Sequence, residues 1–440
     1  MVLAAVIWIV ATSGGRDLFV KEVLGEAFDS QAEHFLRGDV GVDLDPIRPE
    51  AIVVDGKIRM YFGPFPALVR IPLNFVYPTG RGMWSRLSGF CAATLALWSF
   101  SALVGHSLRA SPVRPRARAW LTGVSMVGFV FATPLLYLVG SLSIFNEAII
   151  WGLAWSMAAL FFVARACDSD GNYLTSSILG FSCCAAAALL SRVTFGLPLL
   201  LIALVLACRV RRTGWLRFAA LAAPLGAAVC VYLLLSYARF GNFTGMRYDA
   251  YINSTHREFV REHGMFNVTR VPCSFADYFV WRMPSFHTHP PFVEVYRRPL
   301  PYPKLFSLPI TETFLSITWS SSWLVLGAIF GLVHLFHRNG SKWYWRCIAA
   351  ALFVQVVCIL SYFALAQRYV AELLPFLVFC FTMFFRNRGN WPQHATIMLL
   401  VVLSAGVNFL GTAFWLSNEG PLETRTFWSR VAGKPPPPEQ

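Results

Sequence analysis

Charged residues are scarce in this sequence. They make up 14% of the 440 residues, whereas 56% of the residues are hydrophobic. A soluble domain carries about a quarter charged residues, so these charges are too few to cover the surface of a soluble protein of this length. Their scarcity excludes a fully water-exposed globule, and we expect an integral membrane protein whose surface is partly covered by lipid.

Positive charge is missing in front of the first apolar run. No lysine or arginine precedes residues 2–11, although a secretory signal peptide begins with such residues. The run is also shorter than the roughly 20 residues that a helix needs to cross the hydrocarbon core. Either further residues precede Met1 or this helix is truncated, and we favour the first interpretation.

Metal-ligand and disulfide patterns are also lacking. Of the ten cysteines, Cys273 alone falls in an expected outer segment, so no structural disulfide is predicted. His287 and His289 could hold a metal, but no carboxylate lies near them in the sequence, and we treat them as loop residues. No metal site is predicted, and the need for a divalent metal stays open.

Apolar runs of membrane-spanning length are abundant. We expect an all-α polytopic membrane protein with about eleven transmembrane helices and two extracytoplasmic loop regions. The expected spans are residues 2–11, 84–105, 120–140, 148–164, 175–190, 194–208, 218–238, 315–336, 347–366, 371–385 and 395–416.

The net charge of +14 could indicate nucleic acid binding, but the arginines are distributed as in a membrane protein. They concentrate in alternate loops, as the positive-inside rule requires, so no nucleic acid partner is expected. This pattern places residues 16–81 and 239–311 outside. The predicted modules are 1–238 with the first outer loop 16–81, the second outer loop 239–311, C-terminal helices in 312–416 and an extracytoplasmic tail in 417–440.

The first outer segment carries the clearest local signals. Gly25 to Arg37 reads as an amphipathic helix, which should lie on the membrane with its phenylalanines among the headgroups. Asp55-Gly56 between two apolar stretches predicts a two-residue β-hairpin turn. Gly63-Pro-Phe-Pro66 is expected to break the chain, and the proline-rich second segment cannot form a long helix.

Asp29 and Glu33 are candidate catalytic acids. An acid at the outer surface could take a proton from an acceptor hydroxyl, and Glu33 lies one turn after Asp29 on the same face. The alternative is a solvated acidic stripe in which Glu33 pairs with Arg37. From spacing alone, that alternative is favoured for both residues.

Three further charges interrupt apolar sequence. Glu147 opens a span, where it is either a functional group or an acid favoured by the helix dipole. Arg192 falls on the outer side, against the charge rule, and could bind phosphate through two hydrogen bonds or extend to the interface. Arg368 is similar, with an Arg368–Glu372 helical pair as its alternative.

Together these segments resemble the GT-C superfamily of membrane glycosyltransferases, in the bacterial branch related to lipid A aminoarabinose transferases and protein O-mannosyltransferases. The resemblance covers most of the chain, although each motif alone is loose. The segments that carry it are Phe28-Asp-Ser-Gln-Ala-Glu-His-Phe-Leu-Arg-Gly-Asp39, Asp55-Gly-Lys-Ile-Arg-Met-Tyr-Phe-Gly-Pro-Phe-Pro66, Asn146-Glu147, Ser191-Arg192 and Gln367-Arg-Tyr369.

The resemblance implies transfer of a sugar from a polyprenyl-phosphate carrier to an extracytoplasmic glycan, lipid or protein acceptor, in a bacterial inner or plasma membrane. Asp29 matches the family's first-loop acid, but the adjacent acid of the mannosyltransferases is absent, which leaves Glu33 or a later acid of that loop as a substitute. The remaining expected roles are donor-phosphate binding by Arg192, Arg368 and Lys57, and substrate binding by Glu147, Tyr61 and Tyr369.

Two other function classes stay open. A transporter or flippase would also carry buried charges in a polytopic bundle, but the paired, interrupted helices of inverted repeats are not seen in the sequence. A lipid-linked glycan polymerase or ligase would share the lipid-linked donor. The sequence specifies neither the sugar nor the acceptor.

Overall fold

The helical, multi-span architecture is confirmed. The computed structural model describes residues 1–169, 173–210, 214–243, 245–295, 310–337, 342–386, 391–435 and 437. In these ranges eight helices are long and apolar enough to cross a membrane. They are α4 (Ser85–Arg109), α7 (Ile144–Asp168), α8 (Tyr173–Ser191), α9 (Val193–Val210), α10 (Trp215–Phe240), α15 (Trp343–Ser361), α16 (Gln367–Arg386) and α17 (Trp391–Leu416).

The other three expected spans are short or broken helices. The run 120–140 is divided into α5 (Pro115–Phe131) and α6 (Leu135–Gly140). Asn408 from α17 donates to the carbonyls of Phe131 and Thr133, at 2.7 and 2.8 Å, and so satisfies backbone groups that the break exposes. The run 315–336 forms α13 (Ile317–Ser320) and α14 (Ser322–His337), and the first run forms α1 (Val2–Ala11).

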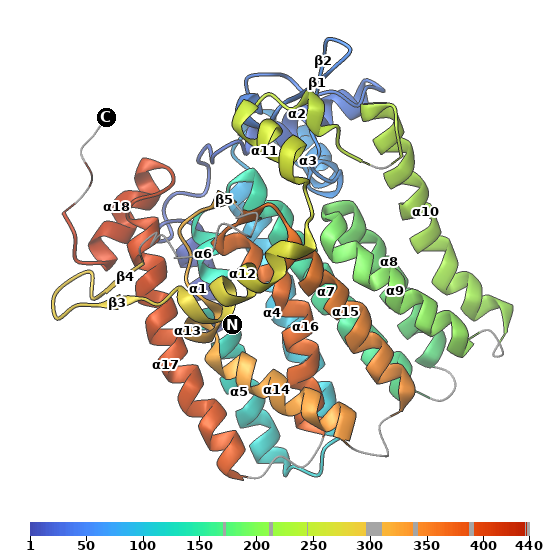
Figure 1. Ribbon diagram of the computed structural model, residues 1–440, viewed down its shortest axis with the longest axis vertical. Coiled ribbons are helices and arrows are strands. Elements are labelled where there is room, and N and C mark those ends of the chain that lie inside the picture. The colour runs from blue at the N-terminus through green and yellow to red at the C-terminus, as the bar shows by residue number, and fades with distance from the viewer. Residues whose placement is uncertain are drawn as a thin grey trace.

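Helices α7 and α16 form the interior of the bundle, and α10 lies at its edge (Figure 1). Helix α7 packs against α4, α8 and α16, and most of its side chains are buried. By contrast, α10 exposes large apolar side chains such as Leu234 and Phe218. A helix that is apolar on its exposed side as well belongs in lipid.

The first loop segment and residues 254–263 of the second lie together at one end of the bundle, which we call the loop face (Figure 1). The first contributes α2 (Glu26–Leu36), the hairpin of β1 (Ile52–Val54) and β2 (Lys57–Arg59), and α3 (Phe65–Val76); the second contributes α11 (Ser254–His263). The predicted hairpin is confirmed, with Val54 opposite Lys57 and positive φ at Asp55 and Gly56. An isolated bridge from Ile52 to Tyr251 joins the two segments.

One local expectation for the first segment is wrong. Phe28 and Ala32 of α2 are buried against Met60, Phe62 and Ile144, so protein and not headgroups covers this face. The expected break at Gly63-Pro-Phe-Pro66 separates β2 from α3, because regular structure stops after Arg59 and α3 begins at Phe65. Proline in the first turn of α3 costs no helical hydrogen bond there.

The described part of the second loop segment is built from short pieces, as its prolines predict. Residues 296–309 of this segment, which include four of those prolines, lie outside the described ranges. The remaining short elements are η1 (Arg48–Glu50), η2 (Pro78–Gly80), η3 (Tyr248–Ala250), η4 (Val268–Arg270), α12 (Val271–Ala276), the π-helix η5 (Asp277–Trp281), β3 (Ser285–Phe286) paired with β4 (Val293–Glu294), β5 (Ile310–Thr311) paired with β6 (Ala364–Leu365), and α18 (Leu422–Val431).

Candidate functional site

A cavity of about 440 Å³ lies under the loop face, between the ends of α8, α9, α10, α15 and α16. Its lining contains aliphatic side chains, five tyrosines and two arginines, and none of the described residues that line it is acidic. The principal lining residues are Leu189, Val193, Leu197, Leu235, Ile359, Tyr61, Tyr232, Tyr248, Tyr362, Tyr369, Arg192 and Arg239.

Arg192 is the single residue between α8 and α9, and its guanidinium group is bound through Nε. Its Nε donates to Oε1 of the fully buried Glu372 at 2.8 Å, and its guanidinium lies 5.6 Å from the ring centre of Tyr369. The backbone of Gly63 crosses this junction so closely that a Cβ there would lie 2.1 Å from the Leu190 carbonyl oxygen. The glycine thus lets the first loop segment form one wall of the cavity.

Arg239, at the end of α10, is a second cation of this cavity that the sequence interpretation did not single out. Its side chain is buried, and Nη1 donates to the Phe62 carbonyl at 2.9 Å. Its Nε and Nη2 have no hydrogen-bond partner among the described residues, and no carboxylate of the described residues forms an ion pair with Arg239. A buried, unpaired guanidinium is costly, so this part of the cavity favours an anion.

The other predicted phosphate ligands are placed differently. Arg368 forms two hydrogen bonds of 2.7 Å with Glu312, and its guanidinium lies 5.1 Å from the Tyr369 ring centre; it does not line the cavity. The alternative pairing with Glu372 is not formed, because Glu372 binds Arg192 instead. Lys57 is exposed on the hairpin, away from the cavity lining.

Tyr61 and Tyr369 do line the cavity together with Arg192, as candidate substrate-binding residues should. Tyr61 also links the two loop segments, since its hydroxyl and that of Tyr251 donate to the same oxygen of Glu50, at 2.8 and 2.5 Å. Burial raises the pKa of Tyr61, with the Glu50 carboxylate as the next cause. Its hydroxyl therefore stays protonated and can donate a hydrogen bond at neutral pH.

Asp29 is fully buried on α2, so it is not part of a solvated acidic stripe. Burial raises the pKa of its carboxyl group, while the guanidinium of Arg70, whose Nε lies 4.0 Å away, lowers it. Asn74 and the Gly82 amide also lower that pKa, although neither completes a hydrogen bond of normal geometry. A raised pKa suits a carboxylate that must accept a proton near neutral pH.

Glu147 is buried beside this acid and is joined to it through Arg70. The Nη2 of Arg70 donates to both Glu147 oxygens, at 2.8 and 2.7 Å. Ser88 donates to Glu147 at 2.6 Å and accepts from Trp151 Nε1 at 2.9 Å. The sequence interpretation did not single out Arg70, although an arginine within the apolar residues 65–76 was a visible signal.

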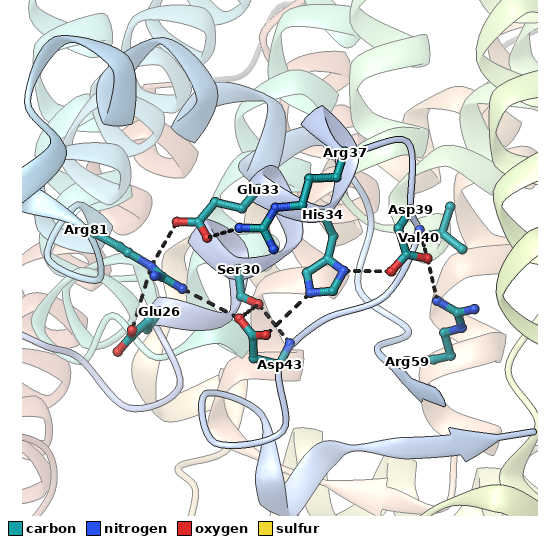
Figure 2. A network of polar contacts seen from close by, with 10 residues as sticks. All are labelled: Glu26, Ser30, Glu33, His34, Arg37, Asp39, Val40, Asp43, Arg59 and Arg81. Atoms are coloured by element: carbon teal, nitrogen blue, oxygen red, sulfur yellow. Dashed lines mark hydrogen bonds and ion pairs between the residues drawn. The ribbon is translucent and has the colours of Figure 1, made fainter. Parts of the chain in front are cut away.

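Glu33 lies outside this buried group, in a polar network on the loop face (Figure 2). It pairs with Arg37 at 3.6 Å, as the alternative interpretation predicted, and with Arg81 at 3.1 Å. In the same network, the hydrogen bond from His34 is the main cause that lowers the pKa of Asp39 to about 2.

Asp29 and the cavity are separate in this structure. Phe62 lines the cavity, and its ring centre is 6.1 Å from that of Phe28, the neighbour of Asp29 in α2. Asp29 and Glu147 do not appear in the cavity lining, although Ala148 does. The structure thus presents two separate polar sites, a cationic cavity and a buried acid.

Comparison with known proteins gives a similarity of structure only. No family model and no curated protein matches the sequence. Among solved structures, ArnT from Cupriavidus metallidurans bound to undecaprenyl phosphate has a TM-score of 0.49 at 13% identity, covering 98% of this chain and 68% of that chain. The apo form of the same protein has a TM-score of 0.43 at 13% identity, covering 98% and 76%. At these values the similarity assigns no activity to this chain.

No metal centre is seen in the part of the chain that the structure describes. Within it, no group of three or more His, Cys, Asp or Glu side chains is arranged to hold a metal ion. His287, one of the two histidines considered from the sequence, lies 3.3 Å from Glu294.

Proposed function

We propose that this protein is a glycosyltransferase that moves a sugar from a polyprenyl-phosphate carrier to a hydroxyl group of an acceptor outside the cytoplasm. The observation that carries the proposal is that the unpaired Arg239 and Arg192 line the same, mainly apolar and aromatic cavity. A phosphate with a hydrocarbon tail matches that combination, because two guanidinium groups bind the anion and the aliphatic wall contacts the tail.

The position of the cavity supports a lipid-linked donor. It is bordered by α9 and α10, and the described part of α10 exposes much of its apolar surface. A lipid tail can therefore lie along this edge of the bundle while its phosphate reaches the arginines under the loop face. The tyrosines at that end supply rings and hydroxyl groups for a sugar.

The chemistry follows from these two sites. The acceptor oxygen attacks the anomeric carbon of the donor, its proton passes to the Asp29 carboxylate, and the bond between that carbon and the phosphate oxygen breaks. Negative charge develops on the departing phosphate, where preorganised cations stabilise it. A single base implies direct displacement with inversion, by analogy with two-carboxylate sugar chemistry. The reaction further requires a rearrangement that brings the acceptor beside Asp29 to the donor, because Asp29 does not line the cavity.

The direct test is transfer by the purified full-length protein in lipid nanodiscs. Synthetic radiolabelled polyprenyl phosphates carrying different neutral and amino sugars serve as donors, and the envelope fraction of the source cells serves as acceptor. We expect label to pass from at least one donor into the acceptor fraction. Movement of a labelled lipid across a vesicle membrane without any transfer would contradict the proposal and favour a flippase.

A further inference from the structure

The surroundings of Asp29 contain more polar atoms than the protein itself satisfies. Asp29 and Arg70 are both fully buried. Both Asp29 oxygens, Nε and Nη1 of Arg70 and the side-chain nitrogen of Asn74 have no hydrogen-bond partner in the described part of the chain. Buried polar atoms are almost always hydrogen-bonded, so five unsatisfied atoms on three neighbouring side chains need an explanation.

Arg70 is prevented from closing onto Asp29 by what it binds on its other side. Its Nη2 is held by both oxygens of Glu147 and lies 3.2 Å from the Ser85 hydroxyl. The Nε therefore stays 4.0 Å from an Asp29 oxygen, which is too long for a hydrogen bond. One oxygen atom of a bound molecule could bridge this gap, because it can lie about 2.8 Å, a normal hydrogen-bond length, from both the Arg70 Nε and the Asp29 oxygen.

Asn74, like Arg70, is held in place by a hydrogen bond to a residue other than Asp29. It lies one turn after Arg70 on α3, and its Oδ1 accepts a hydrogen bond from Trp84 Nε1 at 2.8 Å. That bond fixes the amide plane, and the amide nitrogen, which acts on the Asp29 carboxylate, completes no hydrogen bond of normal geometry with a described residue. The site thus offers a carboxylate that accepts, and guanidinium and amide groups that donate.

We propose that Asp29, Arg70 and Asn74 form the subsite that binds the acceptor hydroxyl, with Glu147 as the residue that positions Arg70. A hydroxyl group both donates and accepts, so it can donate to Asp29 and accept from Arg70 or Asn74. A carboxylate would be repelled by both Asp29 and Glu147, and an ammonium group could not accept the hydrogen bonds that Arg70 and Asn74 offer. The inference rests on the proposed glycosyltransferase function and narrows the group that accepts the sugar to a neutral hydroxyl.

The charges around Asp29 predict how the subsite responds to pH. Arg70 on α3, Arg81 after η2 and Glu147 on α7 all act on this group electrostatically. Arg70 stabilises the ionised form of Asp29, so its removal raises the pKa of that carboxyl group further. The acidic limb of the pH–activity profile should then move to higher pH.

The test compares Arg70→Gln, Arg70→Lys and Asn74→Leu with the exposed-pair control Arg37→Gln in nanodiscs. We measure binding of radiolabelled undecaprenyl phosphate, and the concentration of envelope acceptor that gives half-maximal transfer. Loss of a hydrogen bond should raise that concentration about fivefold for Asn74→Leu and about ten- to hundredfold for Arg70→Gln, with donor binding unchanged. Arg70→Lys should restore part of the loss and return the acidic limb toward the wild-type position.

Two outcomes would overturn the subsite. One is that Arg70→Gln and Asn74→Leu both need the same acceptor concentration for half-maximal transfer as Arg37→Gln. The other is that these two variants bind undecaprenyl phosphate more weakly than the wild type. If Arg70→Gln does not fold because Glu147 is left unpaired, the double variant Arg70→Gln/Glu147→Gln and Asn74→Leu decide the question. Failure of the wild-type protein to bind donor or transfer sugar would reject the proposed function itself, which is a distinguishable result.

Discussion

Replacement of Arg239 by methionine should weaken donor binding without weakening the fold. The side chain offers a phosphate the Nε and Nη2 donors that no described residue uses. A hydrogen bond to a charged group contributes about 1.5–3 kcal/mol, and 1.4 kcal/mol is a factor of ten in affinity. We therefore expect the dissociation constant of undecaprenyl phosphate to rise about 10- to 150-fold in Arg239→Met.

The stability of the unliganded protein gives the matched comparison. Arg239→Met loses the bond to the Phe62 carbonyl but removes a buried unpaired charge, so the unfolding temperature should stay near that of the wild type or rise. Arg192→Met should instead lower it, because the buried Glu372 then has no cation. Removing one partner of a buried pair costs about 3–5 kcal/mol.

Two assays on the same nanodisc preparations decide this prediction. Binding of tritiated undecaprenyl phosphate measures affinity, and thermal unfolding without added lipid measures stability. An Arg239→Met protein that binds donor as tightly as the wild type would refute the phosphate role. A fall in unfolding temperature as large as that of Arg192→Met would show that Arg239 has a structural role instead.

Four further predictions follow. Asp29→Asn should reduce turnover about 10²–10⁴-fold while donor binding is kept, and near-normal turnover would exclude Asp29 as the base. A cysteine at Arg116 should react with an impermeant maleimide only from the inside; labelling from outside would reverse the topology. Gly63→Ala should lower the unfolding temperature, because its Cβ would overlap the end of α8, and an unchanged temperature would contradict that packing. The hydrogen bond from His34 lowers the pKa of Asp39 to about 2. The Asp39 carboxylate therefore stabilises the loop face at pH values above its ordinary pKa, and this stabilisation is lost as the pH falls toward 2. Pepsin at pH 3 should cut residues 38–43 faster in His34→Gln than in the wild type, and equal cleavage rates would contradict this.

The membrane spans and the hairpin were predictable because their signals are local. An apolar run specifies a buried or lipid-facing helix by its length, and Asp55-Gly56 specifies a turn by its backbone preference. The division of residues 120–140 into two helices had a local signal in Pro134, which stands immediately before α6 and disfavours helix at the residue before it. The partner that satisfies the exposed carbonyls was not predictable locally, because Asn408 lies far along the chain.

The candidate site was predictable only in part, because burial and pairing are tertiary properties. Arg192 was identified from its unusual position among apolar residues, and it does line the cavity. Arg239 follows an apolar run, where an arginine is indistinguishable in sequence from an ordinary flanking charge. Asp29 reads as part of an acidic stripe until α3 covers it with Arg70, and nothing local to α2 specifies that contact.

The central claim is that Arg192 and Arg239 bind the phosphate of a lipid carrier, and a structure of the full-length protein in nanodiscs with undecaprenyl phosphate tests it most directly. We predict phosphate density within hydrogen-bond distance of both guanidinium groups, with the polyprenyl chain leaving the cavity along α9 and α10. Phosphate density at another place on the protein, or an unoccupied cavity at saturating lipid, would contradict the account.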